Sequence, residues 1–340
     1  MEILLFIAKF LIGLVVIVKG ADWMTDGASA IAKRFGISTL VIGMTIVAIG
    51  SSAPEFVVSA LAAIKGNTDM AIGNVVGSNI FNILAIMGAT SLVAPVAASK
   101  GNIRNDVPFA ALSSLVVLFA AFDSFLTKDA VDEISRSEGL LMLCMFAIFI
   151  SYTMAIAKKD NGNGNHNENE NENENTTDII NDNDKEKTLQ QTSIFKSILL
   201  VIVGLAFLIM GGDGLVDGAS GIASYMGVSQ SIIALTIVSI GTSAPELAAS
   251  MMAAKKGDTA MALGNVVGSV VFNVFFVLGT AATIHPLALG NISIFDISTL
   301  LVASALLWIF CKSHSALVKW EGVVLLLVQI AYYVILVINE

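Results

Sequence analysis

The chain is poor in charged residues and in the side chains that soluble metal and redox sites use. Only 13% of its 340 residues are Asp, Glu, Lys or Arg, whereas soluble domains carry about a quarter. It has three histidines, and its two cysteines, Cys144 and Cys311, lie far apart in apolar surroundings. Neither a disulfide framework nor a metal-thiolate spacing is present. We therefore expect no redox chemistry and no bound cofactor.

The chain is instead rich in long apolar segments. Apolar residues make up 56% of it and its mean hydropathy is +0.82, a composition typical of a protein embedded in a lipid bilayer. A membrane span needs about 20 mostly apolar residues. On that scale we expect ten transmembrane helices, at 3–32, 38–64, 68–94, 107–126, 138–157, 194–224, 229–254, 259–284, 293–311 and 320–338.

One segment of 41 residues occurs twice in the chain. Residues 42–82 align without a gap to residues 233–273, at a constant offset of 191, and 26 of the 41 positions are identical. An odd number of spans in each copy inverts the second copy across the membrane, as in many secondary transporters. We expect an all-α polytopic membrane protein whose ten helices form two inverted five-helix repeats, residues 1–157 and 194–340.

A polar, low-complexity segment at residues 158–193 separates the two repeats. It holds nine acidic residues and four lysines, and so contributes −5 of the net charge of −9. We expect it to be a disordered linker, and the acidic balance indicates no nucleic-acid partner.

With both termini outside, thirteen Lys and Arg fall in cytoplasmic segments and three outside. The bias predicts a multi-pass cell-membrane protein with a cytoplasmic linker.

The clearest candidates for chemistry are Glu55 and Glu246, each near the middle of a span. A charged group there costs several kcal/mol unless it is paired or faces a cavity. Pro54 and Pro245 remove backbone donors and so break each helix just before its glutamate, which frees carbonyl oxygens. The alternative interpretation, that both are buried and protonated structural carboxyls, is less favoured because the surrounding groups can coordinate a cation. The hydroxyls of Ser51, Ser52, Thr242 and Ser243 could serve as ligands beside the glutamates. Alternatively, they could bond back to the carbonyls of their own helices.

The following span of each repeat carries a polar stripe with a spacing of four. The stripes are Asn74, Ser78 and Asn82, and Asn265, Ser269 and Asn273. Beside them the small pairs Gly73/Gly77 and Gly264/Gly268 permit close helix approach. Carboxylates, hydroxyls, amides and carbonyls make an all-oxygen site, which suits a hard cation such as Ca²⁺. Two carboxylates are neutralised equally by one Ca²⁺ or two Na⁺.

The blocks GSSAPE and GTSAPE, and GNVVGSNIFN and GNVVGSVVFN, resemble the two α-repeats of the cation/calcium exchanger superfamily, in particular its prokaryotic sodium/calcium exchangers. The resemblance implies a secondary active antiporter, not an enzyme. It would exchange Ca²⁺ for Na⁺ by alternating access, as its first and sixth helices slide together, and inward Na⁺ would drive Ca²⁺ extrusion. The implied ion-binding positions are Ala48 and Ser239, through backbone carbonyls, with Ser51, Ser52, Glu55, Ser78, Asn82, Thr242, Ser243, Glu246, Ser269 and Asn273.

Two positions depart from the family pattern. Some relatives carry Asp at the position of Asn273, so this site has two carboxylates and no third. Val270 stands in the second repeat where the first has Asn79, which leaves any role of Asn79 without a counterpart.

Three other functions remain open from the sequence. A proton/calcium antiporter is expected to carry a GNxxE block, whereas this chain has GNVVG. An intramembrane aspartyl protease using Asp22 and Asp213 needs GxGD, but Met210 occupies the first glycine position. A cation channel usually builds its filter from a symmetric oligomer. The aspartates Asp22, Asp26, Asp213 and Asp217 are interpreted as helix-end solvation in preference to ion access. Expected partners are Ca²⁺, Na⁺ and the bilayer, for a monomeric chain.

Overall fold

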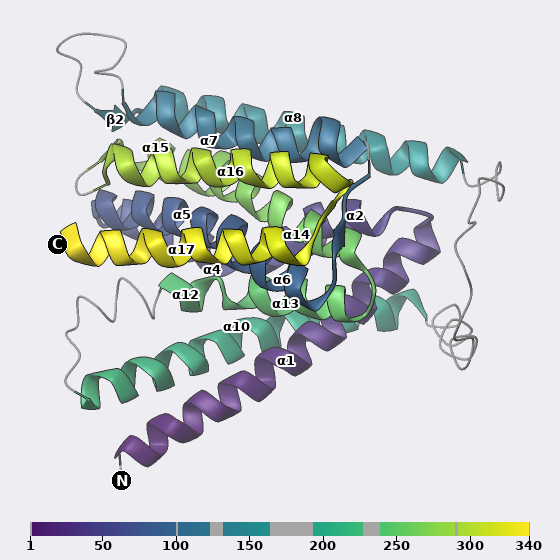
Figure 1. Cartoon of the computed structure of the whole chain (residues 1–340), viewed down its shortest axis with the longest axis horizontal. Helices are drawn as coiled ribbons and strands as arrows, with labels where there is room; N and C mark the ends of the chain where they lie inside the picture. The colour runs from purple at the N-terminus through teal and green to yellow at the C-terminus, as the bar shows by residue number, and fades with distance from the viewer. Residues whose placement is uncertain are drawn as a thin grey trace.

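The computed structural model describes residues 2–99, 101–122, 132–163, 193–226, 239–289 and 292–339. Within these ranges eight helices are long and apolar enough to cross a bilayer. A ninth crossing is a broken one, Thr39–Ser51 followed by Ala53–Ile64, with a bend of 48°. Figure 1 shows most of these helices lying side by side along one direction. The all-α membrane fold is confirmed, while the tenth span stays a prediction because residues 227–238 lie outside the described ranges.

The helical segments of the first half are α1 (Glu2–Phe35), α2 (Thr39–Ile42), η1 (Gly43–Val47), α3 (Ala48–Ser51), α4 (Ala53–Ile64), α5 (Thr68–Phe81), η2 (Asn82–Ile86), α6 (Met87–Val93), η3 (Asn102–Asp106), α7 (Val107–Ala121) and α8 (Arg136–Asn163). Those of the second half are α10 (Ile194–Tyr225), α12 (Ser239–Thr242), α13 (Ala244–Lys255), α14 (Thr259–Val271), η6 (Phe272–Leu278), α15 (Gly279–Ile284), α16 (Ile294–His314) and α17 (Lys319–Asn339). The η segments are π-helical turns within longer helices.

Helix ends differ from the expected ranges where polar residues continue an apolar span. The expected helix 107–126 begins earlier, at Asn102 with the π-helical segment η3, and its described part ends at Ala121. Helix α8 runs to Asn163, six residues beyond the expected end of 157. The length of an apolar segment is set by the thickness of the membrane, but the helix that contains it can continue into the polar residues on either side. The remainder of the expected linker, 164–192, lies outside the described residues.

Two short antiparallel strand pairs join the repeats at the ends of their helices. Strand β1 (Val96–Ala97) pairs with β4 (Ala316–Leu317), and β2 (Glu133–Ile134) pairs with β3 (Leu287–Ala288). Each pair links one half of the chain to the other. Strands of two residues leave no periodic signal in the sequence, so the expectation of helices alone missed them.

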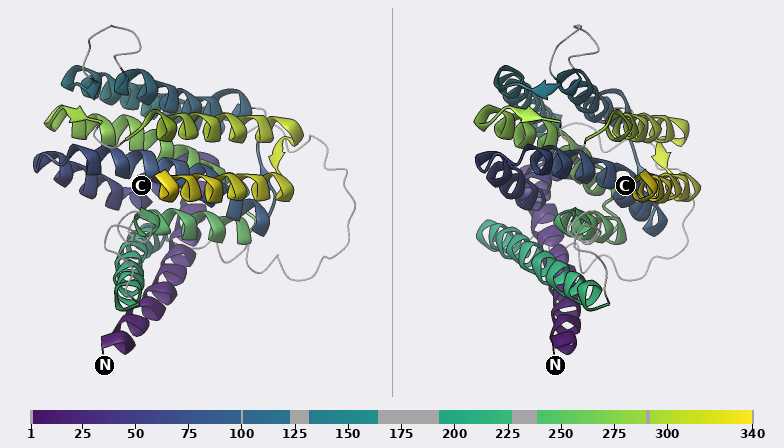
Figure 2. Two further views of the ribbon diagram at one scale, coloured as in Figure 1. Left: turned by 60° about the vertical axis from the view of Figure 1, so that its left-hand side comes forward. Right: turned by 90° about the vertical axis from the view of Figure 1, so that its left-hand side faces the viewer.

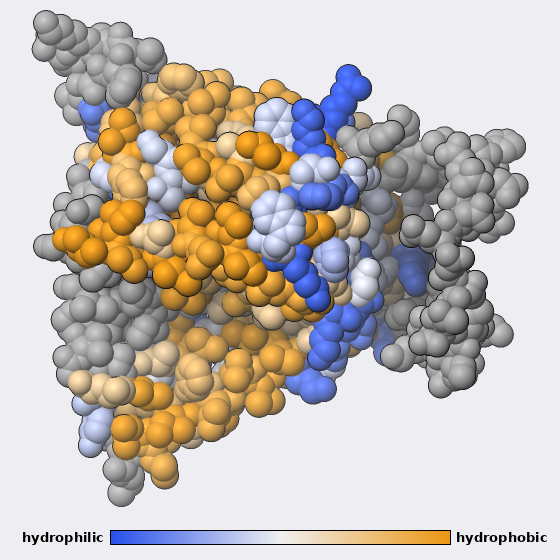
Figure 3. All heavy atoms as spheres, in the orientation of Figure 1, coloured by the Kyte–Doolittle hydropathy of each residue, from blue (hydrophilic) through white to orange (hydrophobic). Residues whose placement is uncertain are grey.

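The central helices of the two halves form the buried core. In the span Thr259–Ile284, 94% of the most apolar stretch is buried, and in Thr68–Val93 the buried share of that stretch is 72%, whereas it is 17% in α1. Figure 3 shows apolar residues covering most of the face in view, with hydrophilic side chains gathered where α16 ends and α17 begins. The spans that carry the predicted polar stripes are therefore the best shielded from lipid.

Helices α1 and α10 form a tightly packed pair that is inclined to the other helices (Figure 2). A Cβ atom added at Gly20 would lie 2.7 Å from the carbonyl of Gly204, and one added at Gly27 would lie 2.7 Å from the carbonyl of Ser197. At Gly13 it would lie 2.7 Å from the carbonyl of Gly211. The residue numbers of the contacts decrease along α10 as they increase along α1, so the two helices are antiparallel, as an inverted repeat requires.

Candidate ion-binding site

Both predicted helix breaks are present and both fall on a serine. Ser52 (φ −84°, ψ 12°) separates α3 from α4, and Ser243 (φ −91°, ψ 6°) separates α12 from α13. A proline is the second residue of the helix that follows each break, where its missing N–H costs no helical hydrogen bond. Each glutamate comes directly after its proline, in the first helical turn, where the helix dipole favours a negative charge.

The two glutamates are held across the repeats by the serines of the opposite breaks. Glu55 and Glu246 are both 0% exposed. Ser52 Oγ donates to Glu246 Oε1 over 2.6 Å, and Ser243 Oγ donates to Glu55 Oε1 over 3.1 Å. The second oxygen of each carboxylate, Oε2, is buried and has no hydrogen-bond partner in the described part of the protein. The two breaks therefore face each other, with one unpaired carboxylate oxygen from each repeat.

The polar stripes lie against the helices that carry the glutamates. Asn74 Nδ2 donates to the Glu55 carbonyl over 3.1 Å and to Ser59 Oγ over 2.9 Å. Asn265 Nδ2 repeats this with the Glu246 carbonyl (3.3 Å) and with Ser250 Oγ (2.9 Å). Because residues four apart share a helix face, each docked asparagine places the rest of its stripe beside the break.

Buried polar atoms without a partner concentrate in this region. Nine residues in the described ranges have one or more such side-chain atoms, and six of the nine belong to the twelve predicted ion-binding positions. Leaving a buried polar group unpaired costs about 1–3 kcal/mol, so six within one set of residues indicate a place built to receive a ligand. The six are Glu55, Ser78, Asn82, Glu246, Ser269 and Asn273.

The other predicted positions are placed less decisively. Ser51 Oγ donates to Asn265 Oδ1 over 3.3 Å and lies 3.4 Å from the carbonyl oxygen of Ala48, which belongs to the same helix as Ser51. The Ala48 carbonyl also accepts the backbone N–H of Ser52 over 3.0 Å. Thr242 is the last residue of α12, and Ser239 is the first. Ion binding by these four positions, like that by the other eight, stays a prediction.

The small residues beside the second stripe pack as predicted. A Cβ added at Gly268 would lie 2.5 Å from the Met44 carbonyl, and the same atom at Gly264 would meet the carbonyl of Leu40. Helix α14 is thus pressed against α2 and η1 of the other repeat. At Gly73, by contrast, the nearest atom would be 3.4 Å away, at Ile292 Cδ1.

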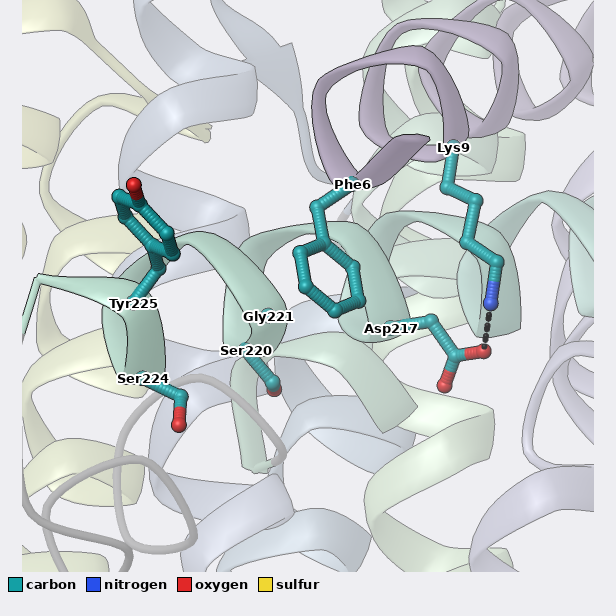
Figure 4. Close-up of a pocket in the computed structure, with 7 residues that line it drawn as sticks. All are labelled: Phe6, Lys9, Asp217, Ser220, Gly221, Ser224 and Tyr225. Atoms are coloured by element: carbon teal, nitrogen blue, oxygen red, sulfur yellow. Dashed lines mark hydrogen bonds and ion pairs between the residues drawn. The ribbon is translucent and has the colours of Figure 1, made fainter. Parts of the chain in front are cut away.

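A groove of about 580 Å³ leads to the breaks along α10, lined by Pro54, Val57, Asp213, Asp217, Thr242 and Pro245, among others. A second hollow, of about 550 Å³, lies further out between α1 and α10, where Lys9 Nζ reaches Asp217 Oδ2 over 3.1 Å (Figure 4). Asp213 and Asp217 are thus groove-lining residues as well as helix-surface ones.

The aspartates of α1 have a different environment. Lys256 Nζ, at the end of α13, lies 2.7 Å from Asp22 Oδ1 and 2.8 Å from Asp26 Oδ1. Their counterparts in the second repeat, Asp213 and Asp217 of α10, line the groove instead. The aspartates on the two sides of the helix breaks therefore have different surroundings in this conformation.

The donor atoms define the kind of ion that fits. No group of three or more His, Cys, Asp and Glu side chains in the described ranges could hold a metal, and the site instead combines two carboxylates with hydroxyl and amide oxygens. Such oxygens suit Ca²⁺ and Na⁺, which accept irregular coordination. Paired broken helices in inverted repeats are typical of secondary transporters, and the buried oxygen atoms between them would suit a hard cation.

The chain belongs to the sodium/calcium exchanger protein family, which matches residues 5–155 and 196–338. CaxA of Alkalimonas amylolytica is 39% identical over 81% of this chain and 80% of its own length. The sodium/calcium exchanger MaX1 of Methanosarcina acetivorans is 32% identical over 96% of this chain and 97% of its own. The sodium-calcium exchanger NCX_Mj, solved after soaking with Na⁺ and Ca²⁺, superposes with a TM-score of 0.77 at 30% identity, over 97% of this chain and 98% of that one.

These likenesses remove one of the open functions. Members of the exchanger family are transporters, so the chain is not an aspartyl protease, and Asp22 and Asp213 are not a catalytic pair. In this structure Asp22 pairs with Lys256 while Asp213 lines the groove. The resemblance to prokaryotic sodium/calcium exchangers, read from the sequence, is confirmed.

Proposed function

We propose that the protein exchanges Ca²⁺ for Na⁺ across the cell membrane, extruding Ca²⁺ as Na⁺ moves inward. One observation carries the proposal: the fully buried carboxylates of Glu55 and Glu246 accept hydroxyl donors from each other's repeat, and each keeps a free buried oxygen. The exchange named for MaX1 and NCX_Mj supports it.

The charge of the site explains why exchange would be obligatory. Two carboxylates in a low-dielectric interior carry a desolvation cost of several kcal/mol each when they are not compensated. One Ca²⁺ or two Na⁺ neutralise them equally well. The loaded site can therefore change sides with either cargo, whereas the empty site cannot do so cheaply, and this coupling separates an exchanger from a channel.

The serines at the breaks can act on both carboxylate and ion. A hydroxyl has one proton to donate and two lone pairs to offer. Ser52 and Ser243 donate their protons to the glutamates, so their lone pairs remain for the ion. We propose that further oxygens come from the buried polar groups of the stripes, namely Ser78, Asn82, Ser269 and Asn273.

The α1–α10 pair is the element proposed to move. Its two helices contact each other through glycines along their length, while α1 is largely exposed to lipid. A groove opens beside α10, and Lys256 ties α1 to the end of α13. By the Lys and Arg bias the α13 end is cytoplasmic, so the groove faces outward. Sliding of the pair would close the groove beside α10 and release α1 from Lys256, so that the site would open to the opposite side of the membrane.

Flux through reconstituted protein tests the proposal. Liposomes loaded with Na⁺ are diluted into Na⁺-free choline medium, and uptake of radioactive Ca²⁺ is followed against liposomes with Na⁺ on both sides. Uptake is expected only with the outward Na⁺ gradient. Equal uptake driven by a pH gradient in choline would identify a proton antiporter instead, and uptake with no counter-ion at all would identify a channel.

A further inference from the structure

The two polar stripes differ at one position, and the structure shows what occupies it. Asn79 in α5 corresponds to Val270 in α14, at the repeat offset of 191. Asn79 is 0% exposed. Its Nδ2 donates to the carbonyl of Val270 over 3.3 Å, and its Oδ1 accepts from Asn273 Nδ2 over 3.1 Å. Asn79 therefore reaches from the first repeat to an amide of the predicted ion site in the second.

The chemistry of these groups fixes which way each amide points. A backbone carbonyl can only accept, so the Asn79 atom that meets Val270 must be nitrogen and the other must be oxygen. That oxygen can only accept, so Asn273 must present its NH₂ group to it. The remaining atom of Asn273 is Oδ1, which is buried and has no partner in the described residues. The oxygen of Asn273 is thereby turned away from Asn79 and left for a ligand.

The equivalent amide of the first repeat has no such support. Asn82 corresponds to Asn273, but the residue that would hold it is Val270, whose side chain neither donates nor accepts. Both Oδ1 and Nδ2 of Asn82 are buried without a hydrogen-bond partner in the described part of the chain. The amide of Asn82 can present either atom, whereas that of Asn273 is held in one orientation.

We infer that Asn79 is a positioning residue of the ion site, which keeps the carbonyl oxygen of Asn273 directed at the bound cation. An amide NH₂ in that place repels a cation, so a freely turning amide weakens binding. The inference rests on the proposed function, because Asn273 is taken as an ion ligand. Loss of one orienting hydrogen bond is expected to weaken Ca²⁺ binding about three- to tenfold.

A double-mutant cycle tests this role. Asn79→Val gives the first repeat the residue of the second, and it is combined with Asn273→Ala and, as the matched control, with Asn82→Ala. The Ca²⁺ dissociation constant is measured by calorimetry on purified protein, and the melting temperature is measured without ions. Asn79→Val should weaken binding about three- to tenfold in the unmutated background, have little effect once Asn273 is alanine, and multiply with the effect of Asn82→Ala.

Two results would overturn the inference. One is an equal loss of affinity with and without the Asn273 side chain, since this indicates a general packing effect. The other is unchanged affinity in well-folded Asn79→Val. If that protein does not fold, Asn79→Ser replaces it, because serine is too short to reach both partners and should give the same pattern. Na⁺-driven Ca²⁺ flux of the unmutated protein is measured in parallel, so that failure of the exchange itself is seen separately.

Discussion

Replacing Glu55 with glutamine removes one of the two charges that the site is built around. Glu55→Gln keeps the size of the side chain and one oxygen, so the effect isolates the charge. The carboxylate is fully buried and its Oε1 accepts from Ser243 over 3.1 Å. Removing one partner of a buried charge pair costs about 3–5 kcal/mol, which is about 10²- to 10⁴-fold in Ca²⁺ affinity. Exchange should fall below detection at ordinary Ca²⁺ concentrations.

The same loss is expected for Glu246→Gln, because its environment repeats that of Glu55 with Ser52 as the donor. Asp69→Asn is the control, since Asp69 also lies in a first helical turn, that of α5, and is outside the site. Ca²⁺ binding and flux are measured for all three variants, with membrane insertion and melting temperature checked. Unmutated affinity in a well-folded Glu55→Gln protein would refute the placement of the ion.

Three further predictions concern the donors, the moving pair and the coupling ion. Ser52→Ala and Ser243→Ala each remove a charge-assisted hydrogen bond worth about 1.5–3 kcal/mol, so Ca²⁺ binding should weaken about ten- to a hundredfold in calorimetry; a negligible change would show that the hydroxyls do not hold the carboxylates. In α10, Gly211→Ala should impair Ca²⁺ flux, because the new Cβ would lie 2.7 Å from the Ile17 nitrogen, whereas Gly214→Ala, at 3.5 Å from Gly13 Cα, should not. Equal flux in both variants would contradict the close α1–α10 packing. Flux should be the same in K⁺ and in choline, because the amide of Asn273 adds no third charge that needs neutralising, and Asn273→Asp should slow transport or make it depend on an added cation; a K⁺ requirement in the unmutated protein would contradict the charge argument.

The sequence predicted the parts of the site that depend on local chemistry. Pro54 and Pro245 remove backbone donors wherever the chain folds, so the two helix breaks followed from the residues alone. The stripe beginning at Asn74 followed from the spacing of four. The repeat itself predicted inversion, and the antiparallel crossing of α1 with α10 agrees with it.

Contacts between the repeats could not be read in the same way. Periodicity says which side chains share a face but not which face of the other repeat they meet. Hence the donation from Ser52 to Glu246, and the bridge from Asn79 to Asn273, appeared only in the structure. The mismatch of Asn79 with Val270 was visible in the aligned repeats, but its meaning required the contact.

The close pairing of α1 with α10 also has a signal in the sequence. Glycines recur every seven residues in α1, at 13, 20 and 27, and at the equivalent positions of α10. A glycine at every second turn on one helix face permits close approach of a partner helix, and this spacing would have predicted the pair. The polar extension of α8 to Asn163 gave no comparable signal, because apolar length does not mark where a helix ends.

Competition between Na⁺ and Ca²⁺ for one site tests the central claim most directly. The Ca²⁺ dissociation constant of the purified protein is measured by calorimetry as Na⁺ replaces choline at constant ionic strength. If Glu55 and Glu246 bind either one Ca²⁺ or more than one Na⁺, the apparent constant should rise with Na⁺ more steeply than in direct proportion. A Ca²⁺ dissociation constant that is the same in Na⁺ and in choline would contradict a shared site.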